Sequence, residues 1–227
     1  MNFKQNINYF KTSDLTKAIG IGLMLLSVAL YFFGWGYISY ILMSICLPVG
    51  ALLFILGSGK RSSDSDIDEY VKRITGGLEI DLIEDKDFAK KLDKSFSPMI
   101  FEGFEYDEGL MLTKAKSGSV RSSRYTKAVI YVLHNSLYIL NRSFSLIEDE
   151  IKNSNCELAL TDIDRIELVA NEKNLTFEKK VFNVKYVRLN IILGGNVYLS
   201  LPAPNDINTD QLVDKINSAI QRAKSNQ

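Results

Sequence analysis

The feature that most constrains this chain is a long stretch near its start that carries no charge. From Ala18 to Gly59 there is no Asp, Glu, Lys or Arg, in a chain of 227 residues. As one α-helix, these roughly 42 residues would be about 63 Å long, twice the ~30 Å thickness of bilayer hydrocarbon. Two crossings joined by a tight turn fit this length. The sequence therefore predicts a transmembrane helical hairpin over residues 18–57.

The break between the two crossings is expected at the sequence FGWGY, residues Phe33–Tyr37. Its two glycines give the backbone freedom to turn, and Trp35 with its neighbouring tyrosines suits a membrane–water interface. The helices are therefore expected near Ala18–Phe33 and Ile38–Leu56.

Small residues four positions apart are a second feature of the apolar stretch. The pairs are Ala18/Gly22 in the first helix and Cys46/Gly50 in the second, which also contains Pro48. Such spacing lets two helices approach closely in a membrane. A chance spacing is the alternative interpretation.

Basic residues flank the hairpin on both sides, whereas the turn is neutral: Lys4, Lys11 and Lys17 before it, Lys60 and Arg61 after it. Positive charge favours the cytoplasmic side, so both termini, including residues 1–17, are predicted to be cytoplasmic. This describes a multi-pass protein of the inner (cytoplasmic) membrane. A secretory signal is the alternative, but its charged lead would be unusually long and a second apolar run follows at once.

The composition argues against several classes of protein. Lys plus Arg and Asp plus Glu both number 27, so net charge gives no support for a nucleic-acid polymer as partner. The two cysteines, Cys46 and Cys156, are far apart, and His134 is the single histidine. No disulfide framework or metal-ligand spacing is present. We therefore expect no catalytic, metal or cofactor site, and not an enzyme.

Residues 58–98 are expected to form a linker and a juxtamembrane helical segment. Their apolar residues recur at spacings that predict a helix, a strand and a second helix in turn: Ile67, Tyr70, Val71 and Ile74; Leu78, Ile80 and Leu82; Phe88, Ala89, Leu92 and Phe96. Ser65 would cap the first helix and Pro98 would end the second. The pattern leaves open whether this segment packs on the main domain or couples it to the membrane.

The remainder of the chain, residues 99–227, begins with β-strand patterns. Strand-like stretches follow one another, separated by turn residues: MIFEGFEY, GLMLTK, KAVIYVLH, LYILN, CELAL, RIELVA, Val187–Leu193 and VYLSL. The continuous apolar run Lys127–His134 indicates a strand covered on both faces at one end. Asn135-Ser136 and Gly194–Asn196 are the expected hairpin turns. Three residues of VYLSL are expected to face the same core: Val197, Leu199 and Leu201.

The last element is predicted to be an amphipathic helix. Its apolar residues form one stripe: Leu212, Val213, Ile216, Ala219, Ile220 and Ala223. Asn208 and Gln211 have capping-box spacing. Antiparallel strands followed by one amphipathic helix predict a small β-barrel or sandwich whose open end the helix fills.

Three stretches resemble a pleckstrin-homology (PH) domain. The sequence EGLMLTKAKSGSVRSSRYTKAVIYVLHNSLYIL (Glu108–Leu140) resembles its opening strands, ELALTDIDRIEL (Glu157–Leu168) its middle strands, and NDINTDQLVDKINSAI (Asn205–Ile220) its closing helix. The closing helix lacks the family's usual tryptophan, as bacterial PH-like domains behind transmembrane helices also do. The resemblance implies an α+β fold: a transmembrane hairpin, then a PH-like antiparallel β-barrel or sandwich capped by a C-terminal α-helix.

A basic stretch lies between two of these strands. Leu112 to Lys127 contains five basic residues and no acid: Lys114, Lys116, Arg121, Arg124 and Lys127. In PH domains that bind inositol phospholipids, the first loop carries Lys, a gap, then Lys/Arg-x-Arg. Here Arg121 and Arg124 are three apart, so the pattern is incomplete. These five residues are the candidate surface for an anionic head group or other ligand, and a solvated hairpin loop is the alternative.

Three functions fit these patterns. The first is a membrane-anchored, non-enzymatic PH-like binding or scaffolding module that binds a protein partner or anionic lipid. The second is a ligand-sensing β-barrel effector, for example a nucleotide-responsive, anti-phage-like one, whose transmembrane helices oligomerise. The third is a membrane enzyme. A filled apolar core would favour the first, a buried polar pocket the second, and a cleft with paired desolvated acids the third.

Overall fold

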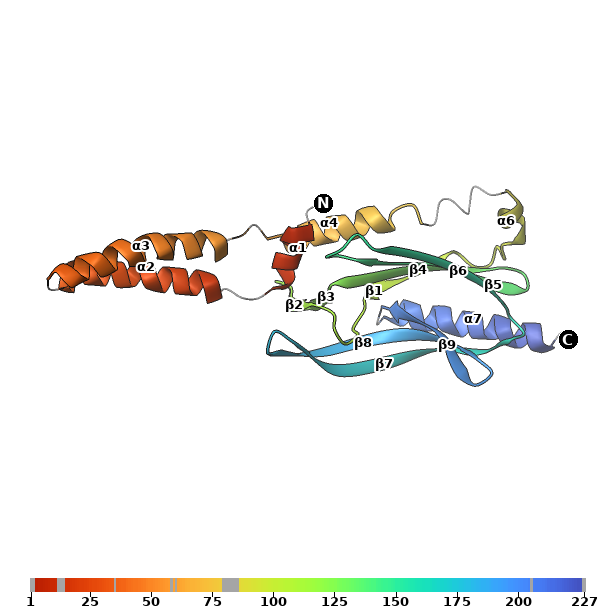
Figure 1. The fold of residues 1–227 in the computed structure, drawn as a ribbon. Helices are drawn as coiled ribbons and strands as arrows, with labels where there is room; N and C mark the ends of the chain where they lie inside the picture. Colours follow the sequence, from red (N-terminus) through yellow and green to blue (C-terminus); the bar gives the residue numbers. More distant parts are fainter. Residues whose placement is uncertain are drawn as a thin grey trace. The chain divides into compact units, whose positions relative to one another are not determined.

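A computed structural model describes residues 3–11, 15–34, 36–57, 59, 61–78, 86–204 and 206–225 of the chain. The chain divides into two compact units, one up to Ser63 and one from Asp64 onward. Figure 1 shows helices in the first unit, and two layers of strands with further helices in the second.

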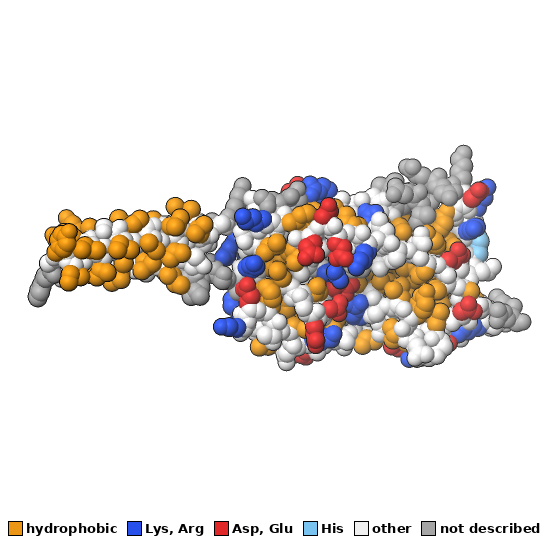
Figure 2. Space-filling model, viewed as in Figure 1, with side chains coloured by type: hydrophobic (Ala, Val, Ile, Leu, Met, Phe, Trp, Pro, Cys, Tyr) orange, Lys and Arg blue, Asp and Glu red, His pale blue; other side chains and the backbone are white. Residues whose placement is uncertain are grey.

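The N-terminal unit consists of helices: α1 (Phe3–Phe10), α2 (Leu15–Phe33) and α3 (Tyr37–Gly57). Helices α2 and α3 run side by side as a hairpin, and each is long and apolar enough to span a membrane (Figure 1). Hydrophobic side chains cover the visible face of this hairpin (Figure 2). The prediction of two apolar helices with Pro48 inside the second is therefore confirmed. Helix α1 was not predicted.

Close packing of the hairpin depends on Gly20 and Gly50. A Cβ atom on Gly20 would lie 2.5 Å from the Phe54 nitrogen and 2.8 Å from the Gly50 carbonyl oxygen. The prediction for Gly50 is confirmed, but that for Ala18 and Gly22 is wrong, because Ala18 is exposed and Gly22 has no atom within 4 Å of a built Cβ. Residues two apart point roughly 200° apart around a helix, so Gly20 and Gly22 cannot share a contact face.

The predicted turn of the hairpin is confirmed in part. Gly36 adopts a φ of +92°, a left-handed conformation that glycine enters without steric cost. The amide of Gly34 donates to the Leu30 carbonyl at 2.9 Å, which ends α2. Trp35, expected at the interface, lies outside the described residues.

The second unit contains two antiparallel sheets and a separate two-stranded hairpin. The four-stranded sheet has the order β1-β4-β5-β6: β1 (Met99–Phe104), β4 (Arg124–Val132), β5 (Ser136–Ser145) and β6 (Ile151–Ala159). The three-stranded sheet has the order β7-β8-β9: β7 (Ile163–Phe177), β8 (Lys180–Leu193) and β9 (Asn196–Ala203). The separate hairpin pairs β2 (Leu112–Lys114) with β3 (Val120–Ser122).

The core lies between the two sheets, where α7 (Ile207–Ser225) packs (Figure 1). Val213, Ile216 and Ile220 of α7 are buried in one cluster with apolar residues of both sheets. The predicted stripe of the last helix therefore faces the core. The fold is α+β, as predicted.

The strands described do not close into a barrel, so that part of the prediction is wrong. β1 and β9 belong to different sheets, although a Cβ atom on Gly103 would lie only 3.1 Å from Pro202 Cβ. Proline has no N–H group and cannot donate to a neighbouring strand. The edges of β1 and β9 therefore meet through side-chain contact instead of a hydrogen-bonded ladder.

Both predicted helix caps in this unit are wrong. Asp206 caps α7, because its Oδ1 accepts from the Thr209 amide at 2.7 Å and from Thr209 Oγ1 at 2.8 Å. Asn208, the predicted cap, lies within the first turn of the helix. Similarly, α4 (Asp64–Thr75) begins one residue before Ser65, so Ser65 is inside that helix.

Two details of the strands also differ from the prediction. The β4–β5 turn is His134-Asn135, one residue earlier than expected, because the Leu133 amide donates to the Ser136 carbonyl at 2.8 Å. Val197 is 54% exposed instead of facing the core. The β8–β9 register shifts between Ile191 and Ile192, and this irregularity interrupts the alternation on which the prediction rested.

The segment between the two predicted domains packs on the outer face of the four-stranded sheet. Ile67 and Tyr70 of α4 are buried, and the Tyr70 ring meets Phe144 of β5 edge to face at 5.9 Å. Further along, α6 (Lys86–Lys91) lies where the second short helix was predicted, and Phe88 packs with the cluster of Val129 and Tyr131. The helix ends at Lys91, so the predictions that it extends to Phe96 and that Pro98 ends it are wrong. The strand expected at Leu78–Leu82 falls largely on residues outside those described.

This packing explains the continuous apolar pattern of β4. Every residue of β4 after Arg124 is buried, because the core covers one face and residues of the described ranges 64–78 and 86–92 cover the other. The prediction of a strand covered on both faces is therefore confirmed, over most of its length.

Candidate functional site

The five basic residues of the predicted anion surface have different surroundings in the structure. Lys114 and Lys116 are exposed around the β2–β3 turn. Lys127 is only 7% exposed, and its Nζ donates to the Thr75 carbonyl oxygen at 3.3 Å. Arg121 and Arg124 are half-buried. The structure therefore leaves two of the five side chains fully in solvent.

Arg121 is held by the start of α4. Its Nη1 lies 2.8 Å from Asp68 Oδ1, and its Nη2 donates to Asp68 Oδ2 at 3.1 Å, which makes a two-pronged ion pair. The same Nη1 donates to the Asp64 carbonyl at 3.2 Å, and the guanidinium lies 5.7 Å from the centre of the Phe104 ring. The backbone amide of Lys116 donates to Asp64 Oδ2 at 2.9 Å.

The other end of α4 is also held by basic side chains. Arg142 of β5 donates from Nη1 to the Ile74 carbonyl at 2.8 Å, beside the Lys127 contact to Thr75. The last carbonyl groups of a helix lack intrahelical donors and carry partial negative charge, so two cations there are favourable. Lys127 and Arg142 therefore clamp α4 onto the four-stranded sheet, and Arg121 clamps it onto the β2–β3 hairpin. Sequence reasoning missed this role, for which the signal was the pair of acids Asp64 and Asp68 on one helix face.

Arg124 takes part in a separate ion pair. Its Nη2 lies 2.9 Å from Glu150 Oε2, and Lys152 Nζ lies 2.7 Å from Glu150 Oε1. The hydrogen bond and charge of Lys152, with those of Arg124, lower the pKa of Glu150. Such a carboxylate stays ionised and is a poor proton donor. No group of three or more His, Cys, Asp or Glu side chains suited to a metal ion occurs in the part of the chain that the structure describes.

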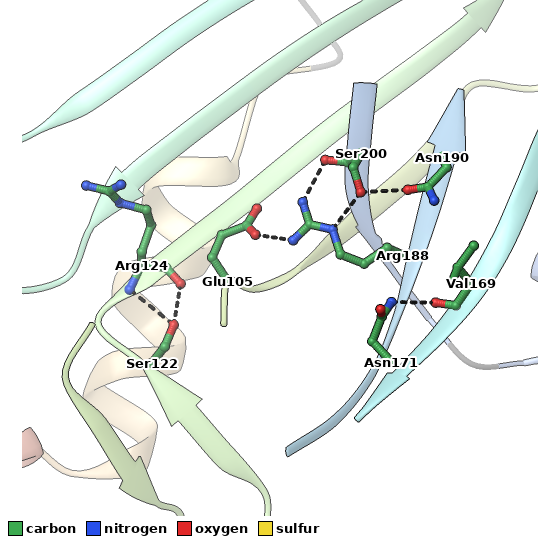
Figure 3. Close-up of polar contacts among 8 residues, drawn as sticks. All are labelled: Glu105, Ser122, Arg124, Val169, Asn171, Arg188, Asn190 and Ser200. Carbon is green, nitrogen blue, oxygen red and sulfur yellow. Dashed lines mark hydrogen bonds and ion pairs between the residues drawn. The ribbon is translucent and has the colours of Figure 1, made fainter. Parts of the chain in front are cut away.

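A buried ion pair joins the end of β1 to the three-stranded sheet (Figure 3). Arg188 Nη1 donates to Glu105 Oε2, its Nε to Ser200 Oγ at 2.9 Å, and its Nη2 to the Ser200 carbonyl at 2.7 Å. Ser200 Oγ donates in turn to Asn190 Oδ1 at 2.7 Å. Arginine does not release its proton in proteins, so this network orients and fastens strands and does not transfer protons.

A groove of about 570 Å³ lies next to this network, a volume within the range of ligand pockets. We call it the seam groove, since it follows the open edge between the two sheets: its lining is Glu102, Gly103, Phe104, Tyr106, Ala170, Asn171, Glu172, Lys185, Tyr186, Val187, Pro202 and Ala203. The rings of Tyr106 and Tyr186 lie 5.1 Å apart. Burial, partly offset by the charge of Arg121, raises the pKa of Tyr106 to about 12, and its hydroxyl donates to the Val120 carbonyl at 2.7 Å.

A second pocket of about 590 Å³ lies beside the later part of α7, with Asp93, His134 and Arg222 among its lining residues. His134 is exposed, and its backbone amide donates to the Lys91 carbonyl at 3.1 Å. Hydrogen bonds from Ser95, with smaller contributions from His134 and Arg222, lower the pKa of Asp93.

The two grooves and the clamped helix are features that the sequence pattern did not locate, because each joins residues far apart in the chain. Lys114 and Lys116 remain the exposed part of the predicted anion surface, and anion binding there stays a prediction. Comparison with known proteins adds no family: no family model, no curated protein and no solved structure matches this chain.

Proposed function

We propose that this chain is a membrane-anchored, non-enzymatic PH-like binding module at the cytoplasmic face of a membrane. The observation that supports this most is the filled space between the two sheets. Buried apolar side chains of β1, β4, β5, β7, β8 and β9 meet α7 there in one cluster. With its interior occupied by its own side chains, a module of this kind binds its ligand on an outer surface.

The other two hypotheses receive less support from the same residues. A ligand-sensing effector whose helices oligomerise would need a hollow, polar interior, and the cluster around Ile216 is apolar and packed. A membrane enzyme would need a desolvated acid free to exchange protons. Glu105 is the buried acid next to a groove, and Arg188 holds it as an ion pair.

Between the two ligand classes of the module, a protein partner is the better fit. Arg121, Arg124 and Lys127 have partners within the chain, which leaves Lys114 and Lys116 exposed. Each basic residue near an anionic membrane surface contributes about 1 kcal/mol, so two lysines give weak lipid attraction. The seam groove, in contrast, offers aromatic rings and a concave surface.

The tests use the full chain, first in cell membranes and then in neutral nanodiscs. Anchoring predicts that the chain stays in the cell-membrane fraction after an alkaline carbonate wash, and complete extraction would refute it. Capture of separate anionic liposomes measures the lipid version. We expect weak capture, lost in high salt and in the Lys114→Glu/Lys116→Glu double variant, and kept in the Lys179→Glu/Lys180→Glu control. Equal capture of neutral and anionic liposomes would leave only the version in which the module binds a protein.

The effector hypothesis has a separate test. If nucleotides stabilised the chain against unfolding and also promoted cross-linking between the transmembrane helices of different copies, the effector would be favoured instead.

A further inference from the structure

The outer edge of β8 is only partly covered. β9 pairs with β8 from Leu193 back to Val187, where Ala203 ends the ladder. On its other side, β8 stays paired with β7 as far as Lys180. Residues 181–186 therefore have no strand partner on the β9 side within the described chain, and an unpaired strand edge presents a row of N–H and C=O groups.

The edge of β1 faces the same opening. β1 is an outer strand of its sheet, and it approaches β9 closely at Gly103 and Pro202. Beyond Ala203 no strand of the described chain fills the seam, and the seam groove begins there; its lining includes Glu102 and Phe104 of β1, residues 185–187 of β8, and the adjacent rings of Tyr106 and Tyr186. The groove is thus the continuation of the line that β9 occupies.

We propose that an extended polypeptide segment of another protein binds in the seam groove as an added strand, hydrogen-bonded to β8 in continuation of β9. This rests on the proposed function, because it names the surface and the partner class of that binding module. Strand addition is a general way to recognise a peptide: backbone hydrogen bonds give affinity, and pockets for alternate side chains give specificity. A small molecule would leave the edge-facing backbone groups of residues 181–186 to water, whereas an added strand would pair them.

The ladder predicts the length of the bound segment. Six residues of β8 lie beyond the end of β9, from Val181 to Tyr186, so an added strand of about six residues and roughly 20 Å fits. The seam groove itself reaches Lys185 and Tyr186, and the added strand would continue from it along the edge of residues 181–184. Alternate side chains of a strand point to opposite faces. We expect an alternating sequence, with apolar side chains against the Tyr106 and Tyr186 rings and polar side chains in solvent.

Charge indicates the character of the partner. Glu102 is exposed and has no ion-pair partner among the residues that the structure describes, while Glu172 has Lys185 at 3.7 Å. The lining of the groove therefore has one more acid than base, apart from the Glu105–Arg188 pair beside it. A basic side chain next to an apolar one would complement it. A second copy of this chain fits less well, because a symmetric pair would place the same acidic lining, with Glu102 exposed, against itself.

The experiment selects phage-displayed random nonapeptides on the full chain in neutral nanodiscs and measures the affinity of a selected, fluorescently labelled peptide. We expect peptides with alternating apolar residues and at least one Lys or Arg. The substitution Ala203→Trp, which fills the end of the groove, should weaken binding about tenfold or more, and Glu102→Lys should weaken it severalfold. Glu148→Lys, an exposed acid away from the groove, is the matched control and should leave the affinity unchanged.

A second measurement does not depend on any protein variant. Two versions of the selected peptide are made, one with its odd-numbered and one with its even-numbered backbone nitrogens methylated, so that each lacks the N–H donors of one edge. The version that lacks the donors facing β8 should bind about tenfold more weakly, and the other should bind nearly as well as the unmodified peptide. Failure to enrich any peptide, or affinity insensitive to Ala203→Trp and to both methylation patterns, would overturn the proposal. Membrane retention and liposome capture by the same chain test the proposed function separately, so the two failures are distinguishable.

Discussion

The two sheets of the second unit are both antiparallel, yet they are buried to different extents. In the four-stranded sheet, β4 is buried along both faces, with Val129 fully buried in the outer cluster. In the three-stranded sheet, burial is mixed along β8 and β9, and Val181, Val197 and Tyr198 are largely exposed. The difference comes from residues 64–78 and 86–92, which pack on the outer face of the first sheet, over β4 and β5. Strands covered on both faces, such as β4, form a structural layer, whereas exposed edges and faces can bind. The edge strand β6 of the first sheet is also largely exposed, so the contrast concerns its central strands.

The strongest test of this comparison places a charge on each sheet. Val129→Asp puts an unpaired carboxylate between the outer cluster and β4, where desolvation costs several kcal/mol, so we expect the chain not to fold stably. Val197→Asp, at an exposed position of β9, should change the free energy of unfolding by less than about 0.5 kcal/mol. Urea unfolding of the full chain in mild detergent, followed by circular dichroism, measures both. Similar stability of the two variants would contradict the comparison.

The next test removes the outer cover from the four-stranded sheet. Ile67 of α4 has no exposed surface, so Ile67→Ala should lower the free energy of unfolding by about 2–5 kcal/mol. Glu69→Ala, on the exposed side of the same helix, is the control and should have little effect. If Ile67→Ala matched that control, α4 would be only a linker and the cover would be unimportant.

A third test concerns the outer edge of the three-stranded sheet at β7. Asn217 of α7 accepts from the Ile166 amide and donates to the Ile166 carbonyl, both at 2.8 Å, and so pairs with the strand edge as another strand would. Asn217→Ala leaves both backbone groups of Ile166 unpaired, and we expect a loss of about 1–3 kcal/mol. Faster hydrogen exchange at the Ile166 amide should accompany it. Ser218→Ala, one residue along on the exposed face, should alter neither quantity.

The smallest expected effect is that of the charged clamp on α4. Asp68 is 60% exposed, so its ion pair with Arg121 is screened by solvent, and Asp68→Asn should cost no more than about 1 kcal/mol. The loss should shrink in high salt, since salt screens exposed charges. Urea midpoints at low and high salt measure it, with Lys72→Gln on the same helix as the control. A salt-independent loss of several kcal/mol would show that the clamp, and not the apolar contact of Ile67, holds the cover in place.

These comparisons also show which features were predictable from sequence. The helices of the hairpin follow from the absence of charge between Ala18 and Gly59, and the buried face of α7 follows from its stripe around Ile216. The both-sided burial of β4 follows from its continuous apolar run. Each of these signals is periodic and local, and burial of apolar surface is strong enough to enforce it.

Other features could not be predicted because they depend on where distant residues meet. The cap at Asp206 was missed because Asn208 and Gln211, three residues apart, also have the spacing of a capping box. The register shift near Ile192 reversed the expectation for Val197. The basic stretch around Arg121 was interpreted as an outward surface, although residues 57 and 53 positions away hold that side chain.

The sequence by itself determined the apolar helical pair, the switch to β-strands after residue 98 and the amphipathic final helix, since each follows from the residue-by-residue pattern of apolar side chains. Only the tertiary structure decided that the sheets stay open, that α4 covers one of them, and that the seam past Ala203 is unfilled. The physical reason is that the hydrophobic effect is non-directional, so the order of apolar residues along the chain is enough to predict which faces are buried. Ion pairs, caps and edge contacts depend on distances of a few ångströms between residues that only folding brings together.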